Sequence, residues 1–569
     1  MIKVQGIPVS PGYAIGNAFI IESESENLIK YENLSVEEQL NLFENSLSLS
    51  KKQLAELIEK GSLSKTETDI INFQREILDD ESFCNKIREY IKSGLAVDKA
   101  IQAAFNEAIS ELSEASSSYL RERVEDLKDL MVRLLKNLSE QPEEKVTLNK
   151  KSIVVAKLLT PSAFAYLDKN LILGIITEEG GTTSHVAIMA KERGIPMIVG
   201  IKNATYKIKN GDLLILDGYS GTLIINPTSR HLDLYKAKMA EYNKLMSEVR
   251  KYLGIKATTK DGVKITVQAN VGNENDLSSS LEVKADGIGL LRTEFLYLER
   301  ETEPSESELI GFFKKASEAF PYDEVIIRTL DVGGDKFPKF MKIEKEANPF
   351  LGVRGIRLTL KHKKILKNQL KAIILANSKN NLKIMLPMIS DYNEVVKARK
   401  LLNEVISDLK GEVNELNVPQ LGIMVETPAA ALMTDVLSEV SDFFSIGTND
   451  LTQYMLAVDR ENKNLSYLYD DMHPSVLRAI KDIVIKAKKP LGVCGEMASE
   501  PLAIPLLIGL GVRKLSVNPP RVLAVKMIIN EISQKEAEEL AESALDMKTA
   551  SKVRLIVKNY LKKKGIKLL

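Results

Sequence analysis

Residues 256–569 contain eight short, apolar, β-branched runs, and stretches with helical patterning separate most of them. A short apolar run bounded by turn signals fits a buried strand. Eight alternating strand and helix units in one stretch of chain predict a closed (β/α)8 barrel. The expected strands are Val263–Ala269, Gly287–Leu291, Glu324–Leu330, Lys383–Leu386, Leu421–Val425, Phe443–Ile446, Leu491–Val493 and Lys514–Val517.

Polar and reactive residues stand where these expected strands end, which is where such a barrel carries its chemistry. Glu426 and Asp450 follow neighbouring strands and are candidate ligands of Mg²⁺, which prefers hard oxygen ligands. A helix cap or a loop ion pair also explains either carboxylate taken alone. The residues at the strand ends are Asn270, Arg292, Arg328, Pro387, Glu426, Asn449, Asp450 and Cys494.

Four arginines of the same region are candidates for anion binding, because a guanidinium group can grip phosphate or carboxylate with two hydrogen bonds. They are Arg292, Arg328, Arg354 and Arg460. A single arginine is ordinarily a solvated surface residue. Arg292 and Arg328 carry more weight because they stand in strand runs, where a buried charge needs a partner that an anionic substrate would supply.

Cys494 stands at the end of an expected barrel strand, where a cysteine can act as an acid or a base. A small buried hydrophobe is the commoner role of a free cysteine. The position of Cys494 favours chemistry.

A second reactive stretch, residues 178–191, reads EEGGTTSHVAIMAK and predicts a strand, a glycine turn and a helix that ends near Arg193. His185 falls in the first turn of that helix. Free backbone N–H groups and the helix dipole favour an anion there, and a neutral imidazole could attack a phosphoryl group. A surface or capping histidine is the plainer alternative.

Strand-like runs in residues 1–21 and 143–226 suggest one α/β domain that contains His185. A helical domain, residues 22–142, interrupts it. Residues 227–255 predict a linker helix, although this helix could equally be the last one of the preceding domain. The expected fold is therefore multidomain α/β, with residues 256–569 forming the barrel.

The helical domain carries two capping-box patterns, at Ser35 and Ser64, and its last helix is expected from about Ser117 to Leu138. A helical bundle inserted between strands is more often a binding module than a catalytic core.

Composition limits the remaining choices. The net charge of the 569 residues is zero, so no overall field attracts nucleic acid or membrane. The chain contains no apolar run of membrane-spanning length and no secretory signal pattern. Cys84 and Cys494 lie far apart, which fits a reducing cytoplasm better than a disulfide framework.

The stretch GGTTSHVAIMAKERGIPMIVG resembles the phosphohistidine signature of the phosphoenolpyruvate-utilising enzymes. Barrel motifs follow in the order of the Enzyme I family, the phosphoenolpyruvate–protein phosphotransferases of the sugar phosphotransferase system. They read GIGLLRTEFLYLER, RTLDVGGDK, NPFLGVRGIR, MVETPAAA, SIGTNDLTQYMLAVDR, HPSVLRAI and GVCGEMA.

This resemblance implies a role for each candidate. His185 would accept the phosphoryl group, Glu426 and Asp450 would bind Mg²⁺, and Cys494 would protonate the enolate as pyruvate forms. The residues implied to hold phosphoenolpyruvate are Arg292, Arg328, Asn449, Asp450 and Arg460, with Arg354 and Lys336 assisting.

The resemblance also implies partners. The helical domain would dock the histidine-containing phosphocarrier protein HPr near Arg123, and the barrel would form a homodimer. The His185 domain would have to move, because one imidazole cannot touch both a substrate at the barrel mouth and an external protein without moving. Gln74, Lys191 and Phe164 depart from the usual family residues, which leaves carrier specificity open.

Two rival functions are less well supported. A dikinase or synthase would need a nucleotide-binding module, but the sequence contains no G-x-x-x-x-G-K-[ST] loop, and the His185 domain is expected to begin at residue 1. A regulatory protein on the same scaffold would have lost reactive residues. His185, Glu426, Asp450 and Cys494 are all present.

Overall fold

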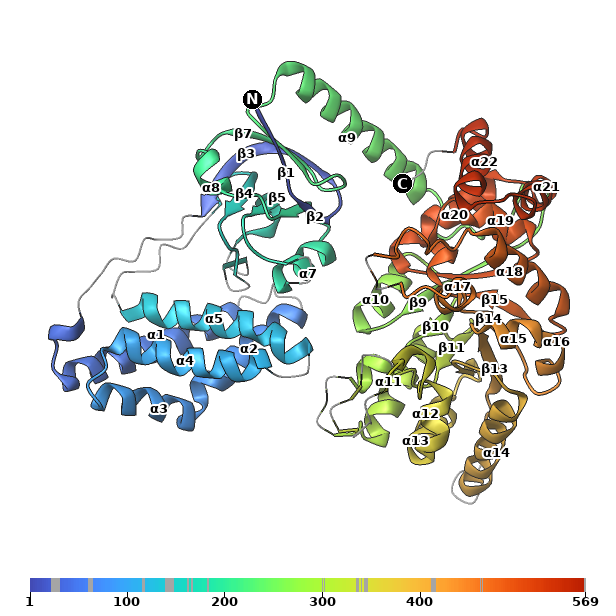
Figure 1. The fold of residues 1–569 in the computed structure, drawn as a ribbon, viewed down its shortest axis with the longest axis horizontal. Coiled ribbons are helices and arrows are strands. Elements are labelled where there is room, and N and C mark those ends of the chain that lie inside the picture. The colour runs from blue at the N-terminus through green and yellow to red at the C-terminus, as the bar shows by residue number, and fades with distance from the viewer. Residues whose placement is uncertain are drawn as a thin grey trace. The chain divides into compact units, whose positions relative to one another are not determined.

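The computed structural model forms two compact units, residues 1–241 and 242–569 (Figure 1). Helix α9 (Ser229–Arg250) runs from the end of the first unit into the second. The structure describes residues 1–21, 31–59, 65–114, 118–138, 148–160, 163–164, 167–181, 184–298, 300, 302–333, 337–338, 340–341, 346–410, 416–460, 462 and 464–566.

Five helices follow the first strands of the first unit, as the helical patterning predicted. Helix α1 (Val36–Glu59) begins at the predicted capping box, where the Ser35 N–H donates to Glu38 Oε2 at 2.8 Å and the Glu38 N–H donates to Ser35 Oγ at 3.2 Å. The second predicted box starts at Ser64, outside the described residues. The other helices are α2 (Lys65–Asp79), α3 (Glu81–Lys92), α4 (Val97–Glu114) and α5 (Ser118–Leu138).

An eight-stranded sheet joins the chain before and after these helices, in the order β1-β8-β7-β3-β4-β5-β6-β2. Parallel pairing of β3 with β4 spans the helical segment. The strands are β1 (Ile2–Gln5), β2 (Ile7–Ser10), β3 (Tyr13–Ile21), β4 (Ser152–Ala156), β5 (Ile172–Thr177), β6 (Met197–Val199), β7 (Leu213–Asp217) and β8 (Thr222–Ile225), with helices α7 (His185–Glu192) and α8 (Ala204–Lys207).

The strand-like run before Pro11 forms two strands, β1 and β2, which are divided at Gly6. Strand β1 pairs with β8 and β2 pairs with β6, so these two segments form opposite edges of the sheet order. The chain passes so close to β6 at Gly6 that a Cβ there would lie 2.5 Å from Ile198 Cγ2. An apolar pattern alone does not reveal this division, because both halves look like one strand.

The second unit contains a closed barrel of eight parallel strands, which confirms the predicted fold class (Figure 1). All eight predicted strands are present, and the last two have the predicted limits. They are β9 (Thr266–Val271), β10 (Ile288–Leu291), β11 (Val325–Arg328), β12 (Leu382–Leu386), β13 (Gln420–Val425), β14 (Phe444–Ile446), β15 (Leu491–Val493) and β16 (Lys514–Val517).

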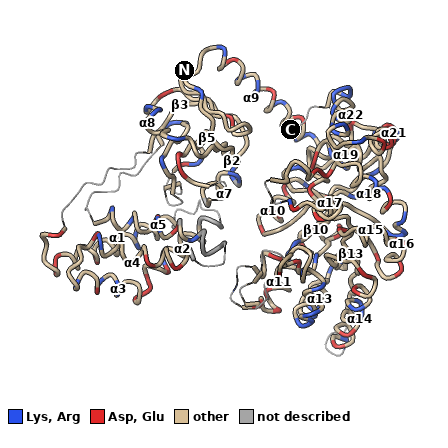
Figure 2. Tube along the Cα trace, in the orientation of Figure 1, with Lys and Arg blue, Asp and Glu red and all other residues tan. Residues whose placement is uncertain are grey.

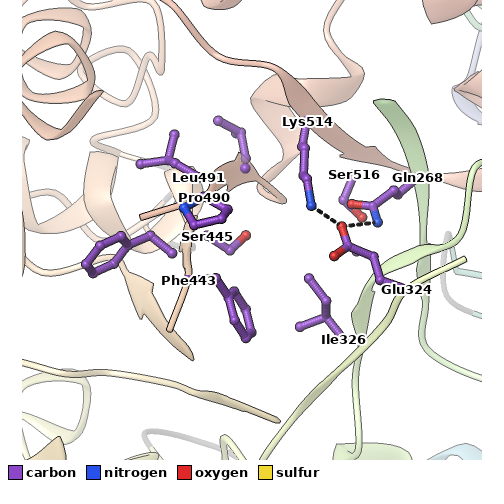
Figure 3. A pocket seen from close by; sticks show the side chains of 13 residues that line it. Gln268, Glu324, Ile326, Phe443, Ser445, Pro490, Leu491, Lys514 and Ser516 are labelled. Atoms are coloured by element: carbon purple, nitrogen blue, oxygen red, sulfur yellow. Dashed lines mark hydrogen bonds and ion pairs between the residues drawn. The ribbon is translucent and has the colours of Figure 1, made fainter. Parts of the chain in front are cut away.

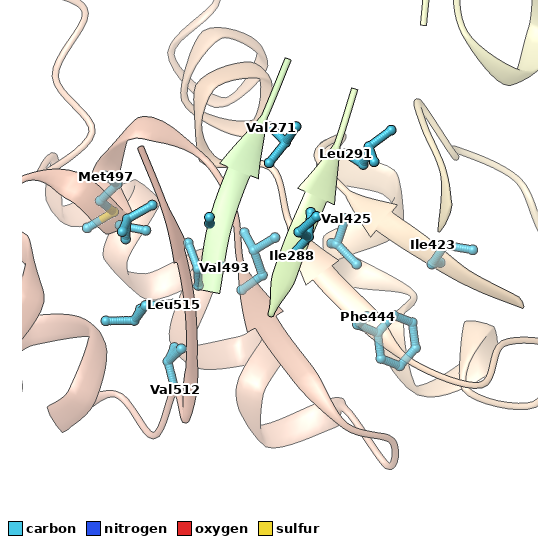
Figure 4. Close-up of a cluster of buried hydrophobic side chains, with 14 of the residues drawn as sticks. Val271, Ile288, Leu291, Ile423, Val425, Phe444, Val493, Met497, Val512 and Leu515 are labelled. Atoms are coloured by element: carbon cyan, nitrogen blue, oxygen red, sulfur yellow. The ribbon is translucent and has the colours of Figure 1, made fainter. Parts of the chain in front are cut away.

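Side chains alternate along the barrel strands, and four of these strands, β10 to β13, contribute to two apolar clusters. One set, which includes Val271, Leu291 and Val425, packs into the large core shown in Figure 4. The other set, which includes Leu290 and Met424, forms a smaller cluster with Cys494. The strands are thereby held rigidly enough to position residues at their ends.

The helices of the second unit are α10 (Glu274–Glu282), α11 (Glu306–Ala319), α12 (Ile356–Lys361), α13 (Lys363–Ala376), α14 (Tyr392–Leu409), α15 (Pro428–Leu432), α16 (Thr434–Leu437), α17 (Thr448–Leu456), α18 (Pro474–Lys486), α19 (Ala503–Gly509), α20 (Val522–Glu531), α21 (Gln534–Leu545) and α22 (Ala550–Lys563). Charges of both signs are spread over both units (Figure 2), in keeping with the net charge of zero. Within the described part of the chain, no helix is both long and apolar enough to cross a membrane.

Candidate active site

A cavity of about 640 Å³ opens at the carboxyl ends of the barrel strands. Its lining includes residues that directly follow β10, β13 and β15, together with the last residue of β11. Parallel strands in a barrel end at the same face, so residues far apart in the sequence meet there. The predicted site residues in the lining are Arg292, Arg328, Arg354, Glu426, Asn449, Asp450, Arg460 and Cys494.

Arg354 connects two carboxylates inside this cavity. Its Nε and Nη2 each donate to Asp331 at 3.1 Å, while Nη1 and Nη2 donate to Asp450 at 2.9 and 3.2 Å. Burial alone would lower the pKa of Arg354, but the two carboxylates raise it, so the guanidinium keeps its charge. Gly333 permits this packing, because a Cβ there would lie 2.5 Å from Arg354 Cβ.

Arg328 is held by two carboxylates, Glu294 and Asp331, that sequence reasoning did not single out. Its Nη2 lies 3.0 Å from Glu294 Oε1, and its Nη1 lies 3.0 Å from Asp331 Oδ2. Burial alone would raise the pKa of Asp331, but the charges of Arg328 and Arg354 lower it. The substrate predicted as partner of Arg328 is therefore not its sole partner, because the protein itself pairs this buried charge.

A signal for the two missed carboxylates was present in the sequence. Glu294 and Asp331 come shortly after Arg292 and Arg328, each just beyond a predicted strand. The rule that a buried arginine needs a partner points to nearby carboxylates as well as to a substrate.

Glu426 follows β13 and is 1% exposed. Its Oε1 accepts a hydrogen bond from the Met388 N–H at 2.6 Å. Burial, together with the nearby carboxylates of Asp450 and Asp331, raises the pKa of Glu426 to about 8. Gly447 leaves room for this side chain, since a Cβ at that position would lie 2.8 Å from Glu426 Oε2.

Glu426 and Asp450 fit a divalent cation, because a positive ion would relieve the repulsion that pushes the Glu426 carboxyl toward protonation. Mg²⁺ is commonly held by one or two carboxylates plus substrate and water oxygens. In the described ranges, no group of three or more His, Cys, Asp or Glu side chains could hold a metal ion. Substrate and water would have to supply the remaining oxygens.

Cys494 directly follows β15, lines the cavity and is 2% exposed. Burial raises the pKa of its thiol to about 11, so the sulfur is protonated at neutral pH. The Asn270 Nδ2 donates to the Cys494 carbonyl at 3.1 Å, and the Ser516 Oγ donates to Asn270 Oδ1 at 2.7 Å. Cys494 is thus both a buried apolar group and a fixed S–H group at the cavity wall.

The other predicted substrate residues differ in how firmly they are held. Asn449 Oδ1 accepts a hydrogen bond from the Glu496 N–H at 2.8 Å, which fixes its amide. Arg292 and Arg460 are exposed residues of the cavity lining. Lys336 lies outside the described residues.

His185 is the first residue of α7, as the N-cap pattern predicted. The Ser184 Oγ accepts a hydrogen bond from the Ala187 N–H at 3.3 Å and caps the helix. Gly180 has φ +112°, a backbone conformation that glycine adopts readily. The His185 side chain lies outside the described part of the structure.

Three family models match the chain, and all three describe PEP-utilising enzymes, where PEP is phosphoenolpyruvate. The PEP-binding domain matches residues 246–534, the mobile domain 148–221 and the N-terminal domain 5–123. A phosphoenolpyruvate-protein phosphotransferase of Mycoplasma genitalium is 38% identical, with 100% of each chain covered. The chain belongs to the phosphoenolpyruvate–protein phosphotransferases. This membership confirms the predicted family and enzyme class.

Other phosphotransferases of the family are similar over nearly their whole length. The one from Listeria monocytogenes is 36% identical, covering 98% of this chain and 99% of the relative. A solution NMR structure of Enzyme I is 32% identical over 42% of this chain and 99% of that chain, with a TM-score of 0.38.

The family models divide the candidate residues. The cavity residues fall in the match to the PEP-binding domain, and His185 falls in the match to the mobile domain. Arg123 falls in the N-terminal match, where its Nη1 lies 2.9 Å from Asp126 Oδ2 and its guanidinium lies over the Phe73 ring. Arg123 is 8% exposed, so it is not a freely solvated docking group.

The three departures from the usual family residues have different settings. Gln74 is buried and donates to Asp129 Oδ2 at 3.0 Å and to the Asp126 carbonyl at 3.2 Å. Phe164 is fully buried, whereas Lys191 is exposed on α7. Gln74 therefore contacts the same segment of α5 that carries Arg123, and Phe164 is part of a hydrophobic core.

Proposed function

We propose that this chain transfers the phosphoryl group of phosphoenolpyruvate to its own His185, releases pyruvate, and then passes the group to a histidine of the carrier HPr. This would be the first step of a sugar phosphotransferase system. The observation that carries the proposal is the barrel cavity, whose lining combines arginines, buried carboxylates and a protonated thiol.

Phosphoenolpyruvate carries a phosphate and a carboxylate, and both groups suit guanidinium partners. Arg292 and Arg460, the more exposed arginines of the lining, would contact the substrate directly. Arg328 and Arg354 would add fixed positive charge, because carboxylates already hold them in place. Asn449 would donate from its amide nitrogen, since its oxygen is engaged. Lys336 is assigned by the resemblance alone.

Glu426 and Asp450 would hold Mg²⁺, which would neutralise charge on the substrate oxygens. Asp450 now binds Arg354 through both oxygens, so metal binding would compete with that contact. The Arg354 guanidinium would retain Asp331 as its partner.

The chemistry assigns one bond change to each reactive group. A neutral His185 imidazole forms the N–P bond while the P–O bond to the enol oxygen breaks. The electron pair leaves with pyruvate in its enolate form. The Cys494 S–H gives its proton to the enolate carbon, and the resulting thiolate regains a proton from solvent. A thiol whose pKa is about 11 keeps its proton until this step.

The partner assignments rest on the resemblance and on the family membership. The helical segment around Arg123 would dock HPr, with Asp126 and Phe73 setting the orientation of the arginine. A homodimer formed through the barrel and a cytoplasmic location are proposed on the same grounds.

The deciding experiment is the intact mass of the protein after incubation with phosphoenolpyruvate and Mg²⁺. We expect a gain of one acid-labile phosphoryl group in the wild type and in a His231→Ala control, and no gain in His185→Ala. His231 is a suitable control because it lies on α9 of the same unit, against Thr228. A His185→Ala protein that still gains the group would refute the assignment of His185, and a folded wild type that gains none would refute the proposed function.

A further inference from the structure

The side chain of Gln369 on α13 reaches residues just beyond two barrel strands from the surrounding helix layer. Its Oε1 accepts a hydrogen bond from the Leu330 N–H at 2.9 Å, and its Nε2 donates to Thr293 Oγ1 at 3.2 Å. Thr293 Oγ1 in turn donates to the Arg328 carbonyl at 3.0 Å. One chain of hydrogen bonds therefore links the helix to the ends of β10 and β11.

This chain of hydrogen bonds holds the backbone segments that carry two of the cavity arginines. Thr293 directly follows Arg292, and Leu330 stands between Arg328 and Asp331. The bonded groups thus lie at the Arg328 carbonyl, two residues beyond it at Leu330, and next to Arg292. The guanidinium of Arg328 is held separately, by its carboxylate partners, so backbone and head group are fixed by different residues.

These hydrogen bonds are shielded from water. Gln369, Thr293 and Leu330 are each 0% exposed. In a buried site, a hydrogen bond that loses one partner leaves the other group unsatisfied, which costs more than the bond itself contributes. Among the described residues that line the cavity, neither Gln369 nor Thr293 is included.

We propose that Gln369 and Thr293 are positioning residues, which hold the ends of β10 and β11 so that Arg292 and Arg328 fit phosphoenolpyruvate. The proposal rests on the proposed role of these arginines in substrate binding. Neither positioning residue touches the substrate. A shift of the strand ends would weaken binding because oriented contacts depend on placement to within about 1 Å.

The test compares Thr293→Val with Thr293→Ser in the full-length chain carrying His185→Ala, so that phosphoenolpyruvate binds without losing its phosphoryl group. Valine keeps the shape of threonine but removes the hydroxyl, whereas serine keeps the hydroxyl. We expect the Kd for phosphoenolpyruvate, measured by titration calorimetry with Mg²⁺, to rise about tenfold in Thr293→Val. We expect it to stay within about twofold of the wild type in Thr293→Ser.

Thr434→Val provides a matched control. Thr434 of α16 is also 0% exposed, and its Oγ1 donates to the Ala430 carbonyl of α15 at 3.0 Å. Neither helix contributes to the described cavity lining. Its loss should lower the melting temperature and leave the Kd unchanged. Equal weakening of binding in Thr434→Val and Thr293→Val would show a general structural effect and overturn the proposal.

A second variant tests whether Gln369 acts through Thr293. Gln369→Met should also raise the Kd for phosphoenolpyruvate. The double variant with Thr293→Val should have about the same Kd as the single variant that binds less tightly, because both changes break the same chain of hydrogen bonds. Wild-type Kd in a folded Thr293→Val protein would overturn the positioning role. Arg292→Met distinguishes a failure of the positioning role from a failure of the proposed function. If Arg292→Met also binds phosphoenolpyruvate with the wild-type Kd, the proposed arginine site is wrong.

Discussion

Burial of Cys494 decides which chemistry its sulfur can perform. The residue is 2% exposed, and burial raises the pKa of the thiol to about 11. A nucleophilic cysteine requires the opposite shift, toward the thiolate. A thiol that keeps its proton throughout the neutral range suits a proton donor, and the fixed carbonyl of Cys494 holds it at the cavity wall.

Replacing Cys494 by alanine should separate the two half-reactions. We expect pyruvate formation to slow by about 10²-fold or more, because the enolate loses its positioned acid. Transfer from preformed phosphohistidine to HPr should proceed at the wild-type rate. Rapid-quench assays of pyruvate and of phosphorylated HPr measure the two steps.

Cys84→Ala serves as the control, because Cys84 is the other buried cysteine and packs in the helical core of the first unit. Equal loss of both steps in Cys494→Ala would contradict the assigned role.

At the scale of strands, the barrel carries different charge clusters at its two ends. The carboxyl ends present the cavity, whereas at the amino ends Glu324, just before β11, pairs with Lys383 of β12 at 2.7 Å and with Lys514 of β16. Gln268 of β9 donates to the same carboxylate at 2.9 Å (Figure 3). This second cluster connects four strands, and it lies at the opposite end of the barrel from the candidate active site. That position indicates a role in stability.

Glu324→Gln should lower the free energy of unfolding by about 2–4 kcal/mol at pH 7, because two partly buried lysines lose their counter-charge. Burial alone would raise the pKa of Glu324, but Lys383 and Lys514 lower it. The stabilisation is therefore present above the ordinary glutamate pKa and is lost as pH falls through the lowered value. Urea unfolding of variant and wild type at pH 7 and pH 4 would show the difference shrinking.

An exposed ion pair provides the comparison for this variant. Lys371 lies 3.0 Å from Glu306, with both side chains more than a third exposed. Glu306→Gln should cost about 0.5 kcal/mol or less. An equally small loss in Glu324→Gln would show that the amino-end cluster does not stabilise the barrel.

The whole molecule consists of two units with separate hydrophobic cores. The barrel and its helices share one large cluster, while the helices and the sheet of the first unit form others. The cavity belongs to the second unit and His185 to the first. On the proposed function, substrate binding and phosphoryl acceptance would therefore reside in different units, and we expect these units to unfold separately.

Differential scanning calorimetry of full-length His185→Ala should show two transitions. Phosphoenolpyruvate with Mg²⁺ should raise the melting temperature of the barrel unit. At a hundredfold excess of ligand over Kd, binding adds about 2.7 kcal/mol to the free energy of unfolding of this unit. The other transition should stay in place. A single transition, or an equal shift of both, would contradict independent units.

Local patterns made much of the fold predictable. Short apolar runs located all eight barrel strands, and the polar residues predicted at their ends, apart from Asn270, line one cavity. The capping box at Ser35 and the helix start at His185 were also predictable. Each of these features depends on residues close together in the sequence.

The sequence by itself therefore determined the elements, their order and the residues presented at the strand ends, because periodicity and caps are local properties. Only the tertiary structure decided which side chains meet. It paired Arg328 with Glu294, joined Arg354 to two aspartates and brought Gln369 against Thr293. Such contacts form between groups far apart in the chain, and their geometry exists only once the barrel has closed.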